Sequence, residues 1–347
     1  MPATSDAGIR LPAHYVADVT TASANTSIAA APSDVSRGLL GAGIAVCAWS
    51  TGTVLAKGIG MGGLAIGAYR FWFFAICIVV WMYVRGARFR WRVVRNSMWG
   101  GIALGADVAL FFSAIKLTSV VNATVIGSMQ PIVVGVIAAR FFGERIRPRD
   151  ALWSLVALSG TVVVVTAAAG DDISDVRGDL LALAAMLSWS GYFIASKNSK
   201  RNMTPTEFTA GTALWTAAIC TPLGFAFGQD MSWPSWQHWA LLAAMAVGSG
   251  IVGHALMNWS LVRIPLWVGS TFTLLIPVFS AILAWIFLGE AVALAQWVAM
   301  AVVIGALAVV VHGQSRPVRA AAPSAEPQPS ASPSASPGSS PGSSSPD

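Results

Sequence analysis

The sequence contains ten apolar stretches of about 20 residues, separated by short connections. An α-helix needs roughly that many apolar residues to cross the hydrocarbon core of a bilayer. Of the 347 residues, 55% are hydrophobic and only 10% are charged, against about a quarter in soluble domains. The chain is therefore predicted to be an all-α integral membrane protein with ten transmembrane helices. They lie near residues 38–56, 63–84, 97–116, 119–140, 151–169, 179–197, 205–227, 237–261, 266–288 and 292–312.

The net charge of +6 follows from an uneven distribution of basic residues across the predicted membrane. One side holds 17 of the 21 lysines and arginines, with clusters at 85–95 and 140–149, while the other keeps Lys57, Lys116 and Arg177. Basic loops stay cytoplasmic because positive charge resists translocation. We therefore expect a cell-membrane protein with both termini in the cytoplasm. Its surroundings are then lipid, and nucleic acid is not an expected partner.

One long stretch of the sequence occurs twice. Residues 112–144 and 258–290 each hold an apolar segment with a central proline, Pro131 or Pro277, and a glutamate thirteen residues after it. The offset between the two copies is 146 residues throughout. One half of the chain is therefore predicted to repeat the fold of the other.

A second match extends the repeat to the first and sixth predicted helices. Trp49 and Lys57 recur as Trp189 and Lys197, at an offset of 140 residues. Each repeat then has five helices, and because five is an odd number the second repeat must enter the membrane from the opposite side. Inverted repeats of this kind are common in secondary transporters, which bind their solute near the bilayer midplane between the repeats.

The repeats divide the chain into four predicted parts. The five-helix repeats occupy residues 38–169 and 178–312. Residues 1–37 lack the apolar region of a signal peptide and are expected to be a disordered cytoplasmic segment. The Pro/Ser/Ala-rich residues 313–347 are expected to be a disordered cytoplasmic tail, since they have too little apolar surface to form a core.

The motifs of both repeats resemble a known domain. Residues 115–119 are Ile-Lys-Leu-Thr-Ser and residues 142–145 are Phe-Gly-Glu-Arg, while the second half has Gly-Asp-Leu-Leu at 178–181 and Phe-Leu-Gly-Glu at 287–290. This combination resembles the EamA domain, the building block of ten-helix members of the drug/metabolite transporter superfamily. The resemblance covers residues 38 to about 312.

The resemblance implies a secondary transporter that moves small organic metabolites across the cytoplasmic membrane by alternating access, with export favoured. It further implies a central cavity lined by the first, third, fourth, sixth, eighth and ninth helices. The second half departs from the first at Arg263 and Pro265, where the first has Leu117 and Ser119, so this turn is expected to differ in shape.

Other functions are less consistent with the sequence. An intramembrane enzyme is one alternative, but no HExxH motif and no pair of mid-membrane aspartates occurs, so an enzyme is not expected. A lipid flippase on the same scaffold is another. No cofactor or metal is expected, and whether protons are a coupling partner is open. The sequence does not specify the solute, the direction of transport or the oligomeric state.

The two central prolines and the two glutamates mark positions of special geometry. Pro131 and Pro277 each remove a backbone hydrogen bond, which predicts either a hinge at the cavity or a fixed kink. Glu144 and Glu290 lie at helix ends, where capping or pairing with neighbours such as Arg145 is expected and gating is the alternative.

The helices that contain the prolines also carry polar residues. Ser270 and Thr273 precede Pro277 on one helix face, and Asn122 and Gln130 precede Pro131. These side chains are predicted to line the cavity, although such residues also serve as contacts between helices.

Asp107 is the one carboxylate near the middle of a predicted helix. Such a charge costs at least about 2.5 kcal/mol in a membrane, so it is paired or functional. It points away from the small face formed by Gly101 and Gly105, which favours the cavity. Arg70 lies at a similar depth, so a static ion pair is one interpretation; uptake of a proton or binding of a cationic group by Asp107 is the other.

The remaining candidates lie on the first, sixth and eighth helices. His254 and Asn258 share a helix face, and His254 is a candidate for proton coupling because imidazole changes charge near physiological pH. Trp49, Trp189 and Tyr192 lie near mid-helix, where their rings are predicted to stack on a solute.

Overall fold

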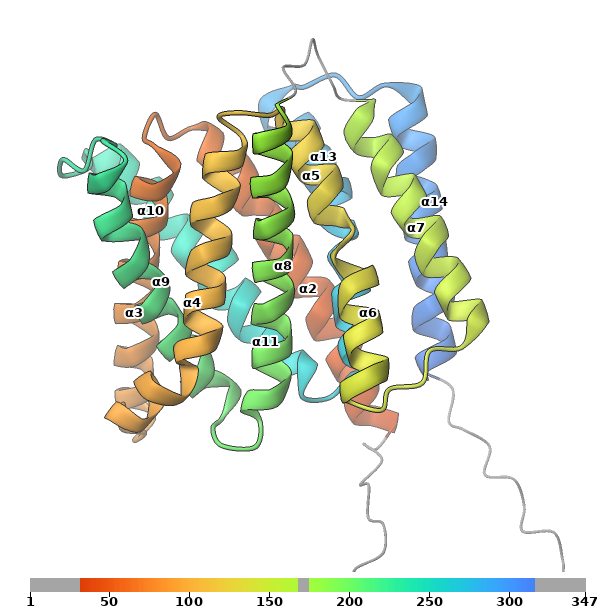
Figure 1. Ribbon diagram of the computed structural model, residues 1–347, viewed down its shortest axis with the longest axis horizontal. Coiled ribbons are helices and arrows are strands. Elements are labelled where there is room, and N and C mark those ends of the chain that lie inside the picture. The colour runs from red at the N-terminus through yellow and green to blue at the C-terminus, as the bar shows by residue number, and fades with distance from the viewer. Residues whose placement is uncertain (1–31, 168–174, 316–347) are drawn as a thin grey trace, which may run out of the picture. The chain divides into compact units, whose positions relative to one another are not determined.

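A computed structural model of the chain describes residues 32–167 and 175–315 and contains the ten predicted spans, drawn in Figure 1. Within these ranges the secondary structure is entirely helical. The expected terminal segments, 1–37 and 313–347, fall almost wholly outside the described residues. The prediction of an all-α membrane fold is confirmed.

Seven of the ten spans are single helices and three are divided. The single helices are α2 (Pro32–Lys57), α3 (Gly63–Val84), α4 (Trp91–Ala114), α7 (Pro148–Thr166), α8 (Val176–Ser199), α9 (Pro205–Ala226) and α14 (Leu294–Ser315). The divided spans are α5 (Val120–Ser128) with α6 (Gln130–Phe141), α10 (Trp236–Met245) with the π-helix η1 (Ala246–Ala255) and α11 (Leu256–Leu261), and α12 (Leu266–Phe272) with α13 (Leu275–Leu288).

Nine of these spans are long and apolar enough to cross a membrane, counted over the described ranges. The remaining span is α9, which is rich in threonine. Its threonines donate largely to carbonyls of their own helix, as Thr209 does to Pro205 and Thr221 to Ala217. The helix packs against both α3 and α4, so its polar side is covered by protein.

The helices that contain Pro131 and Pro277 are interrupted just before each proline. Pro131 is the second residue of α6, and Pro277 is the third residue of α13. Proline is tolerated in a first helical turn because the N–H groups there have no intrahelical partner. The sequence thus starts a new helix at each proline.

The two five-helix halves have opposite orientations in the bundle, as predicted. In Figure 1, α2 starts and α14 ends at the lower side, while α7 ends and α8 starts at the upper side. Equivalent helices pack in pairs: α3 lies against α9, and α7 lies against α14. This pairing is the arrangement that a pseudo-twofold axis in the membrane plane produces.

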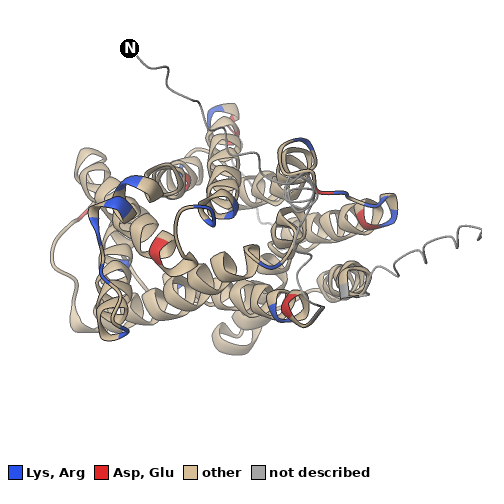
Figure 2. Ribbon diagram, turned by 90° about the horizontal axis from the view of Figure 1, so that it is seen from below, with Lys and Arg blue, Asp and Glu red and all other residues tan. Residues whose placement is uncertain are grey.

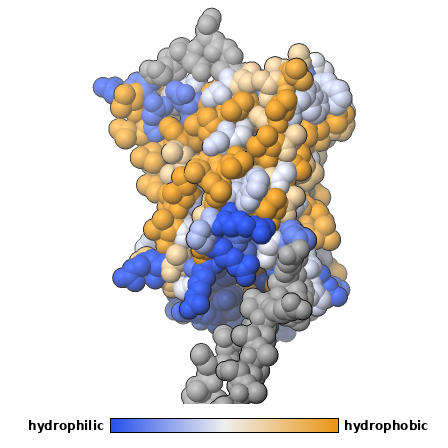
Figure 3. Space-filling view, turned by 90° about the vertical axis from the view of Figure 1, so that its right-hand side faces the viewer, coloured by the Kyte–Doolittle hydropathy of each residue, from blue (hydrophilic) through white to orange (hydrophobic). Residues whose placement is uncertain are grey.

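Basic residues gather at the lower end of the bundle, here named the basic end, which Figure 2 shows from below. Figure 3 shows a wide apolar band between two hydrophilic ends on one face of the molecule. The apolar band matches the hydrocarbon layer, and the charged ends match the two water-facing surfaces. The basic end carries Arg85, Arg88, Arg90, Arg92, Arg95, Arg140, Arg145, Arg147, Arg149, Lys197, Lys200, Arg201 and Arg263.

The contact between α4 and α9 depends on glycines. A Cβ atom at Gly101 would lie 2.2 Å from Cβ of Trp215, and one at Gly105 would lie 2.8 Å from Cδ1 of Ile219. Both distances are far below van der Waals contact. The small face of α4 therefore allows α9 to approach closely, as small residues do between transmembrane helices.

The topology predicts the accessibility of three loop positions. In a background without the three native cysteines, Arg90→Cys and Lys200→Cys should both react with a membrane-impermeant maleimide from the cytoplasmic side only. Ser232→Cys, in the α9–α10 loop, is the control and should react only from the outside. Labelling of intact cells and everted vesicles measures this, and reaction of Arg90→Cys and Lys200→Cys from different sides contradicts the inverted fold.

The glycine contact predicts a stability difference between two alanine substitutions. Gly101→Ala should lower the free energy of unfolding by about 1–3 kcal/mol, because the new methyl group has no room beside Trp215. Gly305→Ala on α14 is the matched control, since nothing lies within 4 Å of its Cβ position. Thermal unfolding in detergent, followed by size exclusion, compares them; equal stability of the two variants contradicts the packing argument.

Candidate functional site

A cavity of about 470 Å³ lies between the two halves of the bundle. Its wall is formed by α2, α3, α4, α5, α8, η1 and the start of α13, with Met245 of α10 and Thr273 of the α12–α13 break. The contributions of α3 begin at Ile66, near the upper end, and those of α4 extend from Leu104 to Phe112, near the same end. The cavity therefore occupies the middle of the bundle and the part away from the basic end.

Two oppositely charged side chains face this cavity. Arg70 of α3 and Asp107 of α4 are both in its wall. The Nε atom of Arg70 is buried without a hydrogen-bond partner, and its guanidinium lies 4.6 Å from the ring centre of Phe71. Among the described residues, Arg70 and Asp107 form no direct ion pair in this conformation. The two side chains thus face one cavity without a direct bond between them.

Aromatic rings form much of the remaining wall. The rings of Trp49 and Trp189 lie edge to face with centres 5.2 Å apart, and Trp189 stacks on Tyr192 at 5.3 Å. Trp49 reaches this position because residue 253 is glycine: a Cβ atom there would lie 2.5 Å from Cδ1 of Trp49. Trp49 and Trp189, which are equivalent in the two repeats, therefore meet at one point of the wall.

His254 joins the cavity to a buried polar network behind it. Its Nδ1 atom lies 3.1 Å from the hydroxyl of Tyr192, which also lies 3.1 Å from Oδ1 of Asn258. Asn258 accepts from the hydroxyl of Ser196 at 2.7 Å and donates to Thr209 at 2.8 Å. The single hydroxyl proton of Tyr192 can point to either neighbour, so the network is compatible with two protonation patterns of the imidazole.

The floor of the cavity is a contact between the two spans that are interrupted before a proline, α5–α6 and α12–α13. Thr273, in the wall, donates to Oε1 of Gln130 at 3.0 Å, and Gln130 is fully buried. Below this bond, α6 packs against α12. At the basic end of α6, Glu144 pairs with Lys197 of the other half, a contact that its neighbour Arg145 was expected to provide. The cavity is thus closed toward the basic end.

The expected site residues divide into two groups. Trp49, Asp107, Trp189, His254, Thr273, Pro277 and Arg70 are in the cavity wall. The others lie behind it or elsewhere: Tyr192 and Asn258 in the buried network, Gln130 under the floor, Ser270 bonded to the carbonyl of Trp267, Asn122 bonded to Thr118, and Pro131 in the first turn of α6.

The sequence reasoning missed several wall residues. Thr53 lies one turn beyond Trp49 on α2, and Thr124 and Ser128 lie one turn apart on α5. Helical spacing from Trp49 could have identified Thr53. Apart from Arg70, the contribution of α3 had no comparable signal, because Ile66, Gly67 and Phe71 lie on a helix that is apolar on nearly all sides.

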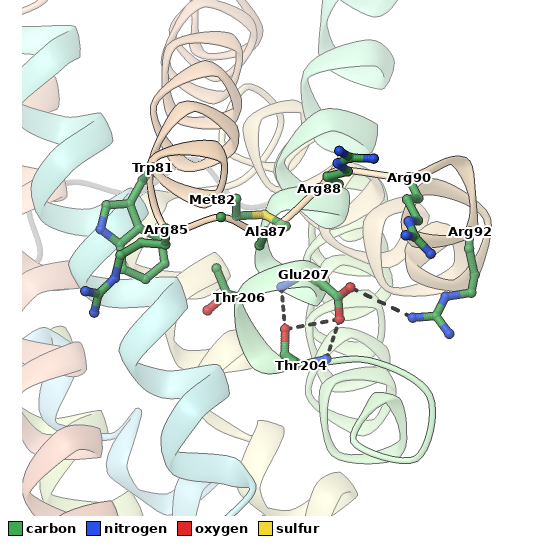
Figure 4. A pocket seen from close by; sticks show the side chains of 11 residues that line it. Trp81, Met82, Arg85, Ala87, Arg88, Arg90, Arg92, Thr204, Thr206 and Glu207 are labelled. Atoms are coloured by element: carbon green, nitrogen blue, oxygen red, sulfur yellow. Dashed lines mark hydrogen bonds and ion pairs between the residues drawn. The ribbon is translucent and has the colours of Figure 1, made fainter.

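A separate hollow of about 580 Å³ lies at the basic end, shown in Figure 4. It is lined by the α3–α4 loop and the start of α9, with Arg88 and Arg90 on its rim. Glu207 connects the two sides of the hollow. Its carboxylate accepts from the backbone N–H of Thr204 at 2.8 Å and lies 3.9 Å from the guanidinium of Arg92. It shares no residue with the central cavity.

Two inverted five-helix repeats around a cavity at the middle of the membrane define the architecture of a secondary transporter. The sequence profile of the EamA-like transporter family matches residues 36–166 and 176–312, so each half of the bundle is one copy. The chain belongs to this family, and the resemblance noted in the sequence is confirmed.

Several relatives are named as exporters. The chain is 36% identical over 154 residues to the "Aromatic amino acid exporter YddG" of Ancylobacter novellus, a match that covers 44% of this chain and about half (52%) of that exporter. It is 28% identical over 211 residues to the "Threonine/homoserine exporter RhtA" of Salmonella typhimurium, covering 59% of this chain and 67% of the relative. A solved structure described as "Crystal structure of protein" matches with a TM-score of 0.69 at 26% identity, covering 80% of this chain and 99% of that one.

Proposed function

We propose that this protein is a secondary exporter of amino acids with large apolar side chains, working by alternating access in the cytoplasmic membrane. The observation that carries the proposal is the placement of Arg70 and Asp107 on one aromatic-walled cavity, with no ion pair between them among the described residues. The basic end faces the cytoplasm in this proposal, so the structure corresponds to a state with its cavity on the outer side.

The charges of the cavity suit a zwitterion. An unpaired charge inside a membrane protein is costly, so groups such as these are usually matched by a partner. The α-carboxylate of an amino acid would pair with the guanidinium of Arg70, and its ammonium group would pair with Asp107. A solute with both charges satisfies both residues at once, whereas a simple anion or cation leaves one of them unmatched.

The uncharged part of the wall suits an apolar side chain. Trp49, Trp189 and Phe71 offer ring faces and edges to a bound solute. A volume of about 470 Å³ is in the range of small-molecule sites, roughly 300–1,000 Å³. The names of the two exporters related to this chain, for aromatic amino acids and for threonine or homoserine, support a solute of this class.

Proton coupling would use the same carboxylate. If Asp107 takes up a proton when the ammonium group leaves, the empty carrier returns with a neutral side chain in the membrane, and release of that proton inside prepares the next cycle. His254 is placed to assist, since it lies in the cavity wall and its Nδ1 atom contacts the hydroxyl of Tyr192. Export would then be driven by protons that move inward.

The function is tested by counterflow in proteoliposomes that contain the purified full-length chain. Liposomes preloaded with unlabelled L-phenylalanine or L-tryptophan should transiently accumulate the labelled amino acid. Liposomes without protein are the control. Absence of counterflow for every apolar amino acid, together with movement of a fluorescent phospholipid, would favour the flippase alternative.

Substitution of Asp107 should separate proton coupling from binding. Asp107→Asn keeps the size of the side chain but can neither carry a negative charge nor exchange a proton. We expect the accumulation driven by a pH gradient to be lost, and the affinity for L-phenylalanine to fall about tenfold, since a bond to a charged group contributes about 1.5–3 kcal/mol. Phenylpropionate, which lacks the amine, should bind the parent and the variant equally. Normal pH-driven transport by Asp107→Asn would make Asp107 structural.

Substitution of Arg70 should have the complementary effect. Arg70→Gln should weaken binding of L-phenylalanine about 10- to 100-fold while leaving phenethylamine, which lacks the carboxylate, unaffected. Arg85→Gln, at the exposed basic end, is the matched control and should change neither affinity. Thermal-shift titrations of the purified proteins measure all three, and equal losses for both ligands in Arg70→Gln would show that Arg70 supports the fold instead.

A further inference from the structure

Two lysine–glutamate pairs connect the repeats, one at each end of the bundle. At the basic end, Nζ of Lys197 lies 3.6 Å from Oε1 of Glu144, and the two side chains are only 9% and 12% exposed. At the opposite end, Lys57 donates a hydrogen bond to Glu290, and these side chains are 56% and 47% exposed. Each pair joins one residue of the first repeat to one of the second.

The two pairs are equivalent under the inverted repeat. Lys57 corresponds to Lys197 at the offset of 140 residues, and Glu144 corresponds to Glu290 at the offset of 146. The helices around them correspond too: α6 with α13, and α12 with α5. At the basic end α6 packs against α12, whereas α13 and α5 make no comparable contact at the other end. One contact therefore exists in two copies, closed at one end and open at the other.

The closed copy is held by several hydrogen bonds. The carboxylate of Glu144 accepts from the backbone N–H groups of Leu266 at 2.7 Å and Trp267 at 3.2 Å, and Lys197 donates to the carbonyl of Ile264 at 2.5 Å. Pro265, between them, has no side-chain acceptor for these N–H groups, unlike Ser119 at the equivalent place, which caps α5. Because the second repeat has Pro265 at this turn, α12 has no side-chain cap of its own, and Glu144 supplies the missing acceptor.

The degree of burial determines how much each ion pair contributes to the stability of a conformation. A buried ion pair is stable only while its charges are fully hydrogen-bonded, and loss of one partner is strongly destabilising. A pair in water contributes little. If one pair becomes exposed while the other becomes buried, the desolvation cost at one end is offset by rehydration at the other, so the two conformations stay close in free energy.

We propose that Lys197–Glu144 and Lys57–Glu290 are the two gates of the carrier and exchange their burial during each cycle. This inference rests on the proposed alternating access. In the structure the cytoplasmic gate is closed around Lys197–Glu144. In the inward-facing state Lys57–Glu290 becomes buried as α13 packs against α5, and Lys197–Glu144 becomes exposed as α6 leaves α12.

Equivalent substitutions at the two ends test this proposal. Glu144→Gln removes the charge that closes the cytoplasmic gate, and Glu290→Gln removes its counterpart outside. The reporter is Ser270→Cys in a background without native cysteines, because Ser270 is fully buried between the floor and the gate and is reached from the cytoplasm only when that gate opens. The readout is the rate of maleimide labelling in everted vesicles, with no solute present.

The two variants should change the labelling rate in opposite directions. Glu144→Gln should raise it about tenfold, and Glu290→Gln should lower it by a similar factor, for a change of about 1.4 kcal/mol in the equilibrium between states. If Glu144→Gln is recovered poorly, Lys197→Gln tests the same gate. Equal labelling in both variants, or a change of the same sign, overturns the proposal. The labelling assay needs no solute. Opposite changes in labelling rate without amino-acid counterflow would therefore support the gates and reject only the proposed substrate.

Discussion

Every backbone N–H and C=O group inside a bilayer must find its partner within the protein, because hydrocarbon offers none. The interruption between α5 and α6 and the one between α12 and α13 meet this demand through bonds within the interrupted turns and through neighbouring helices. At the second one, Leu274 N–H donates to Thr271 and Ile276 N–H donates to Thr273, in tight turns of three residues. The carbonyls released there accept from other helices: Leu274 from the hydroxyl of Thr161 at 3.2 Å, and Ile276 from Ser50 at 3.1 Å.

The position of the helix interruptions determines where the cavity can lie. Interrupted backbone is acceptable only where it faces protein or a water-filled space, and the α12–α13 interruption supplies Thr273 and Pro277 to the cavity wall. The equivalent interruption between α5 and α6 leaves Gln130 beneath the floor, where its amide bonds to Thr273. The two copies of one sequence motif thus have different environments in a single conformation. Alternating access requires two inverted elements that can exchange these environments.

The sequence predicts the parts of the structure that depend on local pattern. Span length and the offsets of 140 and 146 residues predict ten helices in two inverted copies, because both are read directly from the order of residues along the chain. The direction of Asp107 followed from helical periodicity relative to Gly101. Contacts between distant residues were beyond this reasoning: Glu144 binds backbone groups 122 and 123 residues away. Equal depth suggested a bond between Arg70 and Asp107, but rotation of each side chain about its helix axis decides whether the two meet.

The π-helix was also invisible to pattern analysis, although it determines how the site is connected. The wider turns of η1 place Gly253 against Trp49 and present His254 to the cavity. π-helical turns are rare and frequently lie at functional sites. Here the ring of His254 lies 5.2 Å from that of Trp49 and bonds to Tyr192 behind it. Trp49 of α2, Tyr192 of α8 and His254 of η1 therefore meet at one point, where the cavity wall continues into the buried network. Through Tyr192 the cavity wall is joined to Asn258 and Ser196, and Ser196 directly precedes Lys197, which pairs with Glu144.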